Sequence, residues 1–292
     1  MKNRNLIILG VCGSVMVIGG GVYALRPKTV LSNAEEQTTV KTPAKPTYAE
    51  ILAKAQKDGQ KQAAEIKNIS LETYGATECF GIGHGKNLAE MDQKSSATVQ
   101  GVVTNWTKVP EAKNMAVTIL SIYVNQGLTA KSKDLVGKMV YVYQQGGFNT
   151  RRNLSDGMNS NLSEQQLSEE IFSEREDFPV ARIGTELVVN LTKVTKDMIP
   201  EGETIIDPDK SYSLGWSSKS MWVKNSADKY QLVNENYIKK FQDQGLPVEG
   251  NDSTDQTIVN EINELMEKND EKNNRFLVSI CVGLTLFVSG CA

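Results

Sequence analysis

Six short segments rich in β-branched and aromatic residues constrain the fold of this chain more than any other feature of its sequence. Apolar and polar residues alternate along parts of each, which is the period of a half-buried strand. No ten-residue helical segment separates successive strands at regular intervals. We therefore expect a mainly β protein whose antiparallel sheet closes into a small barrel or packs as a sandwich, rather than a doubly wound sheet. The predicted strands are Ala97–Thr107, Met115–Asn125, Lys138–Gln144, Glu186–Val194, Ser220–Lys224 and Lys229–Asn234, with a hairpin turn at Asn225–Asp228.

Two helices are predicted before the first strand. Thr47 and Glu50 match a capping box, in which a side-chain oxygen and a carboxylate satisfy backbone donors at the start of a helix. An amphipathic helix then runs to about Asn68, with sparse apolar residues and a weak point at Gly59. We expect it to lie on the body or to extend a stalk. A second, short helix is expected over Leu88–Ser96.

The segment 147–179 interrupts the predicted strands. It holds seven acidic residues, and Ser163–Glu176 fits one amphipathic helix capped by Ser163 with Gln166 three positions later. Long insertions on a rigid barrel either carry function or are disordered. Two interpretations therefore stay open, a partner-recognition loop and a solvated flexible insertion.

The order of these elements resembles that of a known group of proteins. The strands VQGVVTNWTKV, AVTILSIYVNQGL, GKMVYVYQQGG and RIGTELVVNL, closed by the hairpin WVKNSADKYQLVN, are similar to a family of uncharacterised surface proteins and lipoproteins of Gram-positive bacteria. This resemblance covers about Ala97 to Asn234. It implies a small OB-like barrel, and it carries no catalytic residue to this chain.

The N-terminal run Leu6–Leu25 contains twenty residues without a charge, which is long enough for a transmembrane helix. Arg26 and Lys28 flank it like a stop-transfer signal. The alternative is a cleaved signal peptide, with a cleavage site after Ala24 or a second, more distant site after Ala34. The body between the hydrophobic ends holds one cysteine, Cys79. Such a low cysteine content is common in exported proteins of Gram-positive bacteria. We expect a single-pass anchor with the body outside the cytoplasm.

The C-terminal run 276–292 contains seventeen uncharged residues and resembles a lipoprotein signal peptide, with Val288–Cys291 as its lipobox and Cys291 as the lipidation candidate. Lipidation there would leave a fragment with only one further residue. Three interpretations stay open: a membrane-inserting tail, a reading frame merged with a neighbouring lipoprotein at Met266, and a precursor of a secreted signal peptide fragment.

Charge and histidine content exclude several function classes. The formal net charge is −3, from 32 basic and 35 acidic residues, so we expect no nucleic acid as the main partner. One histidine, His84, rules out any mechanism that needs two. His84 and Cys79 lie in a glycine-rich run that lacks the spacing of a phosphate-binding loop. They are the only catalytic candidates, as base and nucleophile, and the alternative is a glycine-rich turn with an inert thiol.

No metal or cofactor motif is complete. The run from Asp207 begins like a calcium-binding loop but has Tyr212 where glycine is needed and Ser218 where glutamate is needed, so an EF-hand is rejected. Aromatic residues on the strands suit either a ligand-binding face or cross-strand packing; they are Trp106, Trp216, Trp222, Tyr123, Tyr141 and Tyr143.

These observations predict a division of the chain into six parts. The parts are a signal-anchor (1–25), a disordered linker (26–46), a helical and glycine-rich segment (47–96), the barrel domain (97–245), a polar linker (246–275) and a hydrophobic tail (276–292). We expect a membrane-anchored binding or interaction module with an unknown protein or small-molecule ligand. The alternatives are a surface hydrolase or thiol-dependent enzyme around Cys79 and His84, and a peptide precursor.

Overall fold

The computed structural model describes residues 45–74, 85–109, 116–154, 161–195, 207–214, 217–244 and 255–271. The chain divides into two units, Met1–Lys45 and Pro46–Ala292, and the helices and strands of the described residues lie in the second unit. Its helices are α1 (Tyr48–Lys67), α2 (Leu88–Lys94), α3 (Arg151–Leu154), α4 (Glu164–Leu167), α5 (Glu235–Asp243) and an unlabelled helix over 255–271, with 3₁₀ turns at Ala130–Leu135, Pro208–Lys210 and Ser217–Ser220 among the described residues. Its strands are β1 (Ser70–Tyr74), β2 (Ala97–Lys108), β3 (Val117–Gly127), β4 (Met139–Gln145), β5 (Gly147–Thr150), β6 (Glu170–Arg175), β7 (Glu186–Lys193), β8 (Ser211–Leu214), β9 (Met221–Lys224) and β10 (Tyr230–Leu232).

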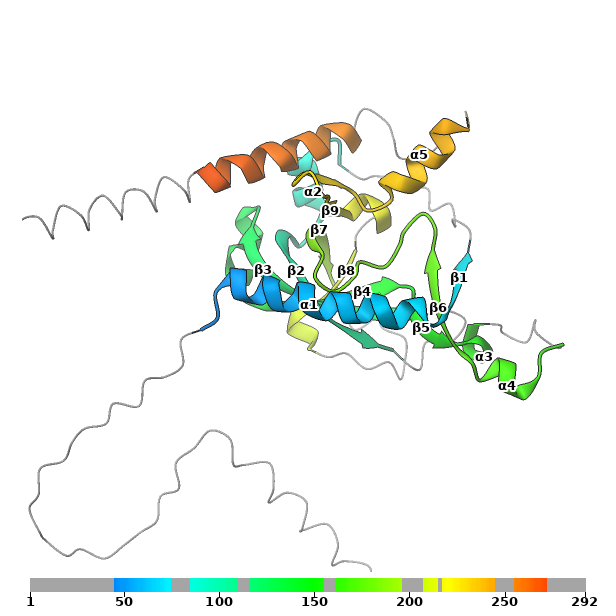
Figure 1. Ribbon diagram of the computed structural model, residues 1–292. Helices are drawn as coiled ribbons and strands as arrows, with labels where there is room; N and C mark the ends of the chain where they lie inside the picture. The colour runs from blue at the N-terminus through cyan, green and yellow to red at the C-terminus, as the bar shows by residue number, and fades with distance from the viewer. Residues whose placement is uncertain are drawn as a thin grey trace, which may run out of the picture. The chain divides into compact units, whose positions relative to one another are not determined.

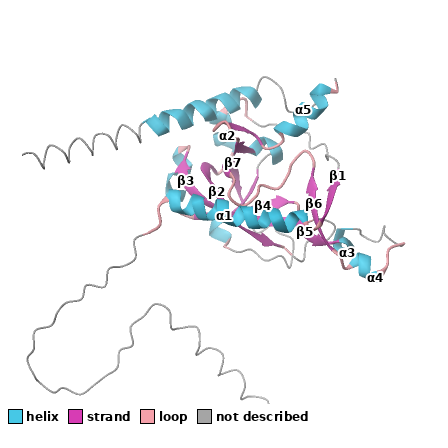
Figure 2. Cartoon of the chain, in the orientation of Figure 1, coloured by secondary structure: helices cyan, strands magenta, loops and turns pink. Residues whose placement is uncertain are grey.

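Five strands form a closed barrel in the order β7-β2-β3-β4-β8, with β8 pairing back to β7. Figure 2 shows the strands in magenta, with β2, β3, β4 and β7 of the barrel labelled. The prediction of a mainly β, barrel-forming chain is confirmed. The prediction that every pairing is antiparallel is wrong at one place in the barrel, because β4 and β8 are parallel. A closed ring with an odd number of strands cannot alternate direction throughout, so at least one parallel pair is required.

All six predicted strands are present within one or two residues of their expected limits. Four of them belong to the barrel, and β9 and β10 extend its sheet from β7. The predicted turn joins β9 to β10, with Asp228 at a φ of 63°. The fifth barrel strand, β8, was not predicted, because its four residues lie directly after the polar run that begins at Asp207.

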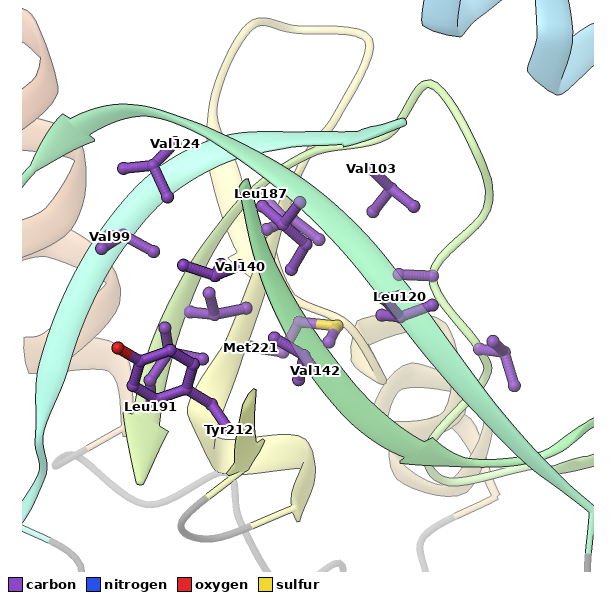
Figure 3. Packing of buried hydrophobic residues seen from close by; sticks show 14 of the residues in the cluster. Val99, Val103, Leu120, Val124, Val140, Val142, Leu187, Leu191, Tyr212 and Met221 are labelled. Atoms are coloured by element: carbon purple, nitrogen blue, oxygen red, sulfur yellow. The ribbon is translucent and has the colours of Figure 1, made fainter. Parts of the chain in front are cut away.

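The interior of the barrel is filled mainly by aliphatic side chains, together with Tyr212 and Met221 (Figure 3). These residues come from alternate positions of the strands, as expected where one face of a strand points inward. Their burial is almost complete, and it removes the apolar area that drives closure. The interior residues include Val99, Val103, Leu120, Ile122, Val124, Val140, Val142, Leu187, Val189, Leu191, Tyr212 and Met221.

A second apolar cluster covers the outer face of β7 and β9. Val188 and Trp222 point away from the interior and pack against Ile258, Ile262 and Met266, which lie one helical turn apart. In Figure 1 this helix, drawn in orange, lies beside α2, which contributes the buried Met91. Residues 255–271 fall inside the range where we expected a polar linker, and they instead form a helix that packs on the barrel.

Helix α1 follows the predicted course. Its capping box at Thr47 and Glu50 is present, and it ends at Lys67 with Asn68 as its C-cap. Gly59 lies where the helix meets the loop before β7, and a Cβ added there would lie 2.0 Å from the carbonyl oxygen of Ile183. Gly184, with a φ of 86°, lies against the backbone of Gln56 in the same way. Two glycines therefore let the helix and the loop approach each other at backbone contact.

The insertion 147–179 forms a small second sheet with β1, in the order β1-β6-β5. The predicted helix over Ser163–Glu176 begins with the expected capping box, but it ends at Leu167. The rest becomes β6, because this segment pairs with β1 on one side and β5 on the other. Ile171 and Phe172 are fully buried as a result. Pairing with a distant segment, together with this burial, outweighs the local helical pattern.

The hydrophobic runs 6–25 and 276–292 lie outside the described residues. The helices that are described include none with the length and apolar character needed to cross a bilayer. The anchor and the tail therefore remain predictions from the sequence.

The contact at Gly59 gives a stability prediction. Gly59→Ala should lower the free energy of unfolding by about 1–3 kcal/mol, because the added methyl group overlaps the Ile183 carbonyl. Helix propensity alone predicts the opposite sign, a gain of about 1 kcal/mol. Urea denaturation measures the difference. The exposed neighbour Gln60→Ala is the control, and Gly59→Ala being as stable as this control would contradict the contact.

Candidate functional site

The sequence-predicted candidates for chemistry lie outside the described residues. This is true of Cys79 and His84, of the lipidation candidate Cys291, and of Trp216. Within the described ranges, no three His, Cys, Asp or Glu side chains form a group that could hold a metal ion. The candidate site is therefore built from other residues.

The predicted aromatic residues are distributed over several surroundings rather than one face. Trp222 is buried in the outer cluster, and Tyr123 stacks on Tyr48 of α1 with ring centroids 6.4 Å apart. Tyr141 and Tyr143 pack beside Ile119 on the outside of the barrel. These four side chains fit the packing interpretation. Trp106 is different, because it lines a pocket.

The pocket lies between α1 and one end of the barrel and has a volume of about 340 Å³. Helix α1 supplies one wall, the C-terminal half of β2 and the start of β3 supply another, and β5 and the loop before β7 complete it. The lining residues are Asp58, Lys61, Gln62, Glu65, Asn105, Trp106, Lys108, Thr118, Phe148 and Ile183. We call this cavity the α1 pocket.

Aromatic rings form the apolar part of the α1 pocket. Trp106 is nearly parallel to Phe172, with centroids 5.8 Å apart, and Phe148 meets both rings edge-on. The guanidinium of Arg182 lies 4.6 Å from the Phe172 centroid and 5.6 Å from that of Trp106. Such aromatic and cation–π contacts fix ring orientation beyond what apolar burial alone provides.

Hydrogen bonds hold this cluster against the end of the barrel. The Trp106 indole Nε1 donates to the Ala181 carbonyl at 2.9 Å, and Gln144 bonds to the same segment through both of its amide atoms. Glu174 accepts from the Val180 amide and pairs with Arg182 at 3.0 Å. The segment 178–183 is thus fixed across the barrel end, and it positions the pocket floor.

The rim of the pocket carries charges of both signs. Asp58 pairs with Lys54 at 2.7 Å and with Lys61 at 3.3 Å, and these hydrogen bonds lower the pKa of its carboxyl group. Lys108 pairs with Glu170 at 2.7 Å. The rim therefore combines acidic and basic groups that largely compensate each other.

The walls also contain Gln62, which is 7% exposed. Its Oε1 accepts a hydrogen bond from the Ile183 amide at 3.0 Å, which ties α1 to the loop before β7. The sequence did not indicate Gln62 or Phe148 as site residues. Nothing in the local sequence of either marks it, since each becomes part of a site only through contact with a distant segment.

A second polar cluster, the tyrosine network, joins α1 to the opposite part of the barrel. The Tyr48 hydroxyl donates to Glu186 at 3.0 Å and accepts from Gln100 at 3.2 Å, and Asn125 donates to Gln100 at 2.9 Å. Lys224 lies 3.6 Å from Glu186. Burial, with the charge of Glu186 adding to it, raises the pKa of Tyr48 far above its ordinary value. Burial likewise raises the pKa of nearby Tyr230.

Comparisons of the chain with family models, with curated proteins and with solved structures gave no match. The geometry of the α1 pocket and the amino-acid sequence are therefore the basis for inferring a function.

The raised pKa values of Tyr48 and Tyr230 predict unfolding at alkaline pH. In the unfolded chain both groups lose their protons near pH 10, whereas the folded protein keeps them protonated. The two tyrosines contribute fully to the free energy of unfolding below about pH 10. Above that pH, the free energy of unfolding should fall by up to about 1.4 kcal/mol per pH unit for each tyrosine. Urea titrations between about pH 8 and 11 measure this slope. The double variant Tyr48→Phe, Tyr230→Phe should flatten it, and an unchanged slope would contradict the assignment.

Proposed function

We propose that this protein is a non-enzymatic binding module, anchored in the cell membrane with its barrel outside the cytoplasm, and that the α1 pocket holds its ligand. The observation that carries the proposal is the pocket itself, in which an aromatic floor and a polar rim meet on a rigid support. Ligand sites typically combine apolar walls with a few placed polar groups. The volume of about 340 Å³ suits a small molecule or a short segment of a larger one.

We further propose that the barrel is OB-like. Five strands with a Greek-key order, closed by a pairing between the third and the fifth, support this proposal. OB folds use the barrel surface and its connecting loops to bind ligands. The α1 pocket lies at one end of the barrel, where such connections meet.

The membrane proposal is supported by the sequence and by where the chain enters and leaves the folded body. Tyr48, at the start of α1, is linked through Gln100 to Asn125 of β3. The adjacent Gln126 accepts a hydrogen bond from Asn269, near the last described residue of the helix 255–271, at 2.9 Å. Both ends of the described body therefore lie on one side of the barrel (Figure 1), so the uncharged runs 6–25 and 276–292 can reach the same bilayer.

We do not extend the proposal to catalysis. The hydrolase and thiol-enzyme alternatives depend on Cys79 and His84, and the peptide-precursor alternative depends on the C-terminal run; these residues lie outside the described ranges. No specific observation favours any of the three.

Fragment screening tests the binding role. In ¹⁵N-labelled protein, compounds that enter the α1 pocket should shift the Trp106 indole resonance, which Trp106→Phe identifies. Phe148→Leu should weaken the binding of these compounds by about threefold to tenfold, because the substitution keeps an apolar side chain but removes the aromatic ring. Tyr141→Phe, on the outside of β4, is the control. A library that shifts no Trp106 signal would contradict a binding role for this pocket.

Protease treatment of intact cells tests the topology. We expect peptides from residues 46–271 to be released, while the segment containing residues 6–25 stays with the membrane, because the uncharged run is embedded and the barrel is outside. Mass spectrometry of released and retained fractions gives the result. Cells lysed before treatment are the control for protease access. Release only after lysis would mean that the barrel faces inward.

A further inference from the structure

The α1 pocket offers no net charge to a ligand. Its four ionisable lining residues comprise two acids, Asp58 and Glu65, and two bases, Lys61 and Lys108. Asp58 and Lys61 pair with each other, and Lys108 pairs with Glu170. A phosphate or other anion would therefore find no uncompensated positive partner among these lining residues, and the pocket favours a ligand without negative charge.

Three polar side chains of the pocket retain unused hydrogen-bonding capacity within the described part of the structure. Gln62 uses its Oε1 for the Ile183 amide, and its Nε2 makes no hydrogen bond. The side-chain amide of Asn105 and the carboxylate of Glu65 also make no hydrogen bond with the described residues. Together they offer donors from two amides and acceptors from an amide and a carboxylate. This mixture suits groups that both donate and accept, which is the property of hydroxyls.

The polar side chains suit the hydroxyl groups of a ligand, and the aromatic floor suits an apolar face of the same ligand. Trp106 and Phe148 line the pocket with apolar ring surface next to these polar groups. A ligand that fits must present an apolar face to the rings and a hydrogen-bonding edge to Gln62, Asn105 and Glu65. A sugar ring has both, because its C–H groups form faces and its hydroxyls project from its edge.

Resting on the proposed binding function, we propose that the α1 pocket binds a neutral sugar, as one or two rings of a glycan. The volume of about 340 Å³ lies at the lower end of the range for ligand sites, which fits a mono- or disaccharide unit rather than a long chain. An apolar peptide side chain would cover the Nε2 of Gln62 without accepting a hydrogen bond from it, which costs binding free energy. A nucleotide would bring charge that the balanced rim does not match.

The test uses full-length protein in lipid nanodiscs, since maltoside detergents carry a sugar headgroup. Saturation-transfer NMR and calorimetry are run with four probes: N,N′-diacetylchitobiose, maltose, a blocked phenylalanine–leucine dipeptide and AMP. We expect saturable binding of at least one disaccharide, with the strongest saturation transfer at its ring C–H protons. Empty nanodiscs give the background.

Two variants of pocket residues test whether the disaccharide binds in the α1 pocket. Asn105→Ala removes an exposed side-chain amide, and Glu65→Gln keeps the size of the side chain but removes its charge. Each substitution should weaken the binding of the disaccharide by about fivefold or more. Gln60→Ala, exposed on α1 but outside the pocket, should leave binding unchanged. Thermal unfolding of all three variants checks that each is folded.

Binding of the four probes distinguishes a wrong sugar assignment from a wrong binding function. Disaccharide binding that both pocket variants weaken supports the sugar assignment and the binding function. Binding of the dipeptide or AMP in the pocket, without either disaccharide, overturns the sugar assignment and leaves a binding module. Disaccharide binding that neither variant changes overturns the pocket as its location. If none of the four probes binds, the sugar assignment is overturned, and the fragment screen at Trp106 decides whether the binding function stands.

Discussion

The hydrogen bonds of β8 hold the structure closed. This strand, Ser211–Leu214, pairs in parallel with β4 and antiparallel with β7, and these two ladders turn an open sheet into a ring. Closure buries the aliphatic interior and leaves no free strand edge at this seam. Gln144 of β4 holds the segment 178–183 by hydrogen bonds at one end of the barrel, and the α1 pocket lies there.

Local chemistry was sufficient to predict most of the strands and the helix starts. Alternating β-branched residues mark β2, β3, β4 and β7, and the capping boxes at Thr47 and Ser163 are both present. What could not be predicted depends on distant partners. Strand β6 takes its conformation from β1, which lies about a hundred residues earlier in the chain, and β8 is too short to show a period.

The α1 pocket was only partly predictable for the same reason. Trp106 could be recognised as a candidate, because an aromatic residue on a barrel strand is a common part of a ligand face. Gln62 and Phe148 could not, because they reach the site from α1 and from the insertion. Gly59 looks in the sequence like a weakness of a helix, whereas in the structure it allows the close contact with Ile183 that forms one pocket wall.

In the proposed binding function, α1 would link ligand binding to mechanical load. The helix lines the pocket with Asp58, Lys61, Gln62 and Glu65, and it also begins at Thr47, where the preceding chain enters the folded body. If the proposed ligand binds better when the helix is seated on the barrel, it stabilises the seated helix, and a pull that unseats the helix weakens the binding of that ligand. For the proposed ligand of the α1 pocket, occupancy and tension on the preceding chain would therefore be coupled.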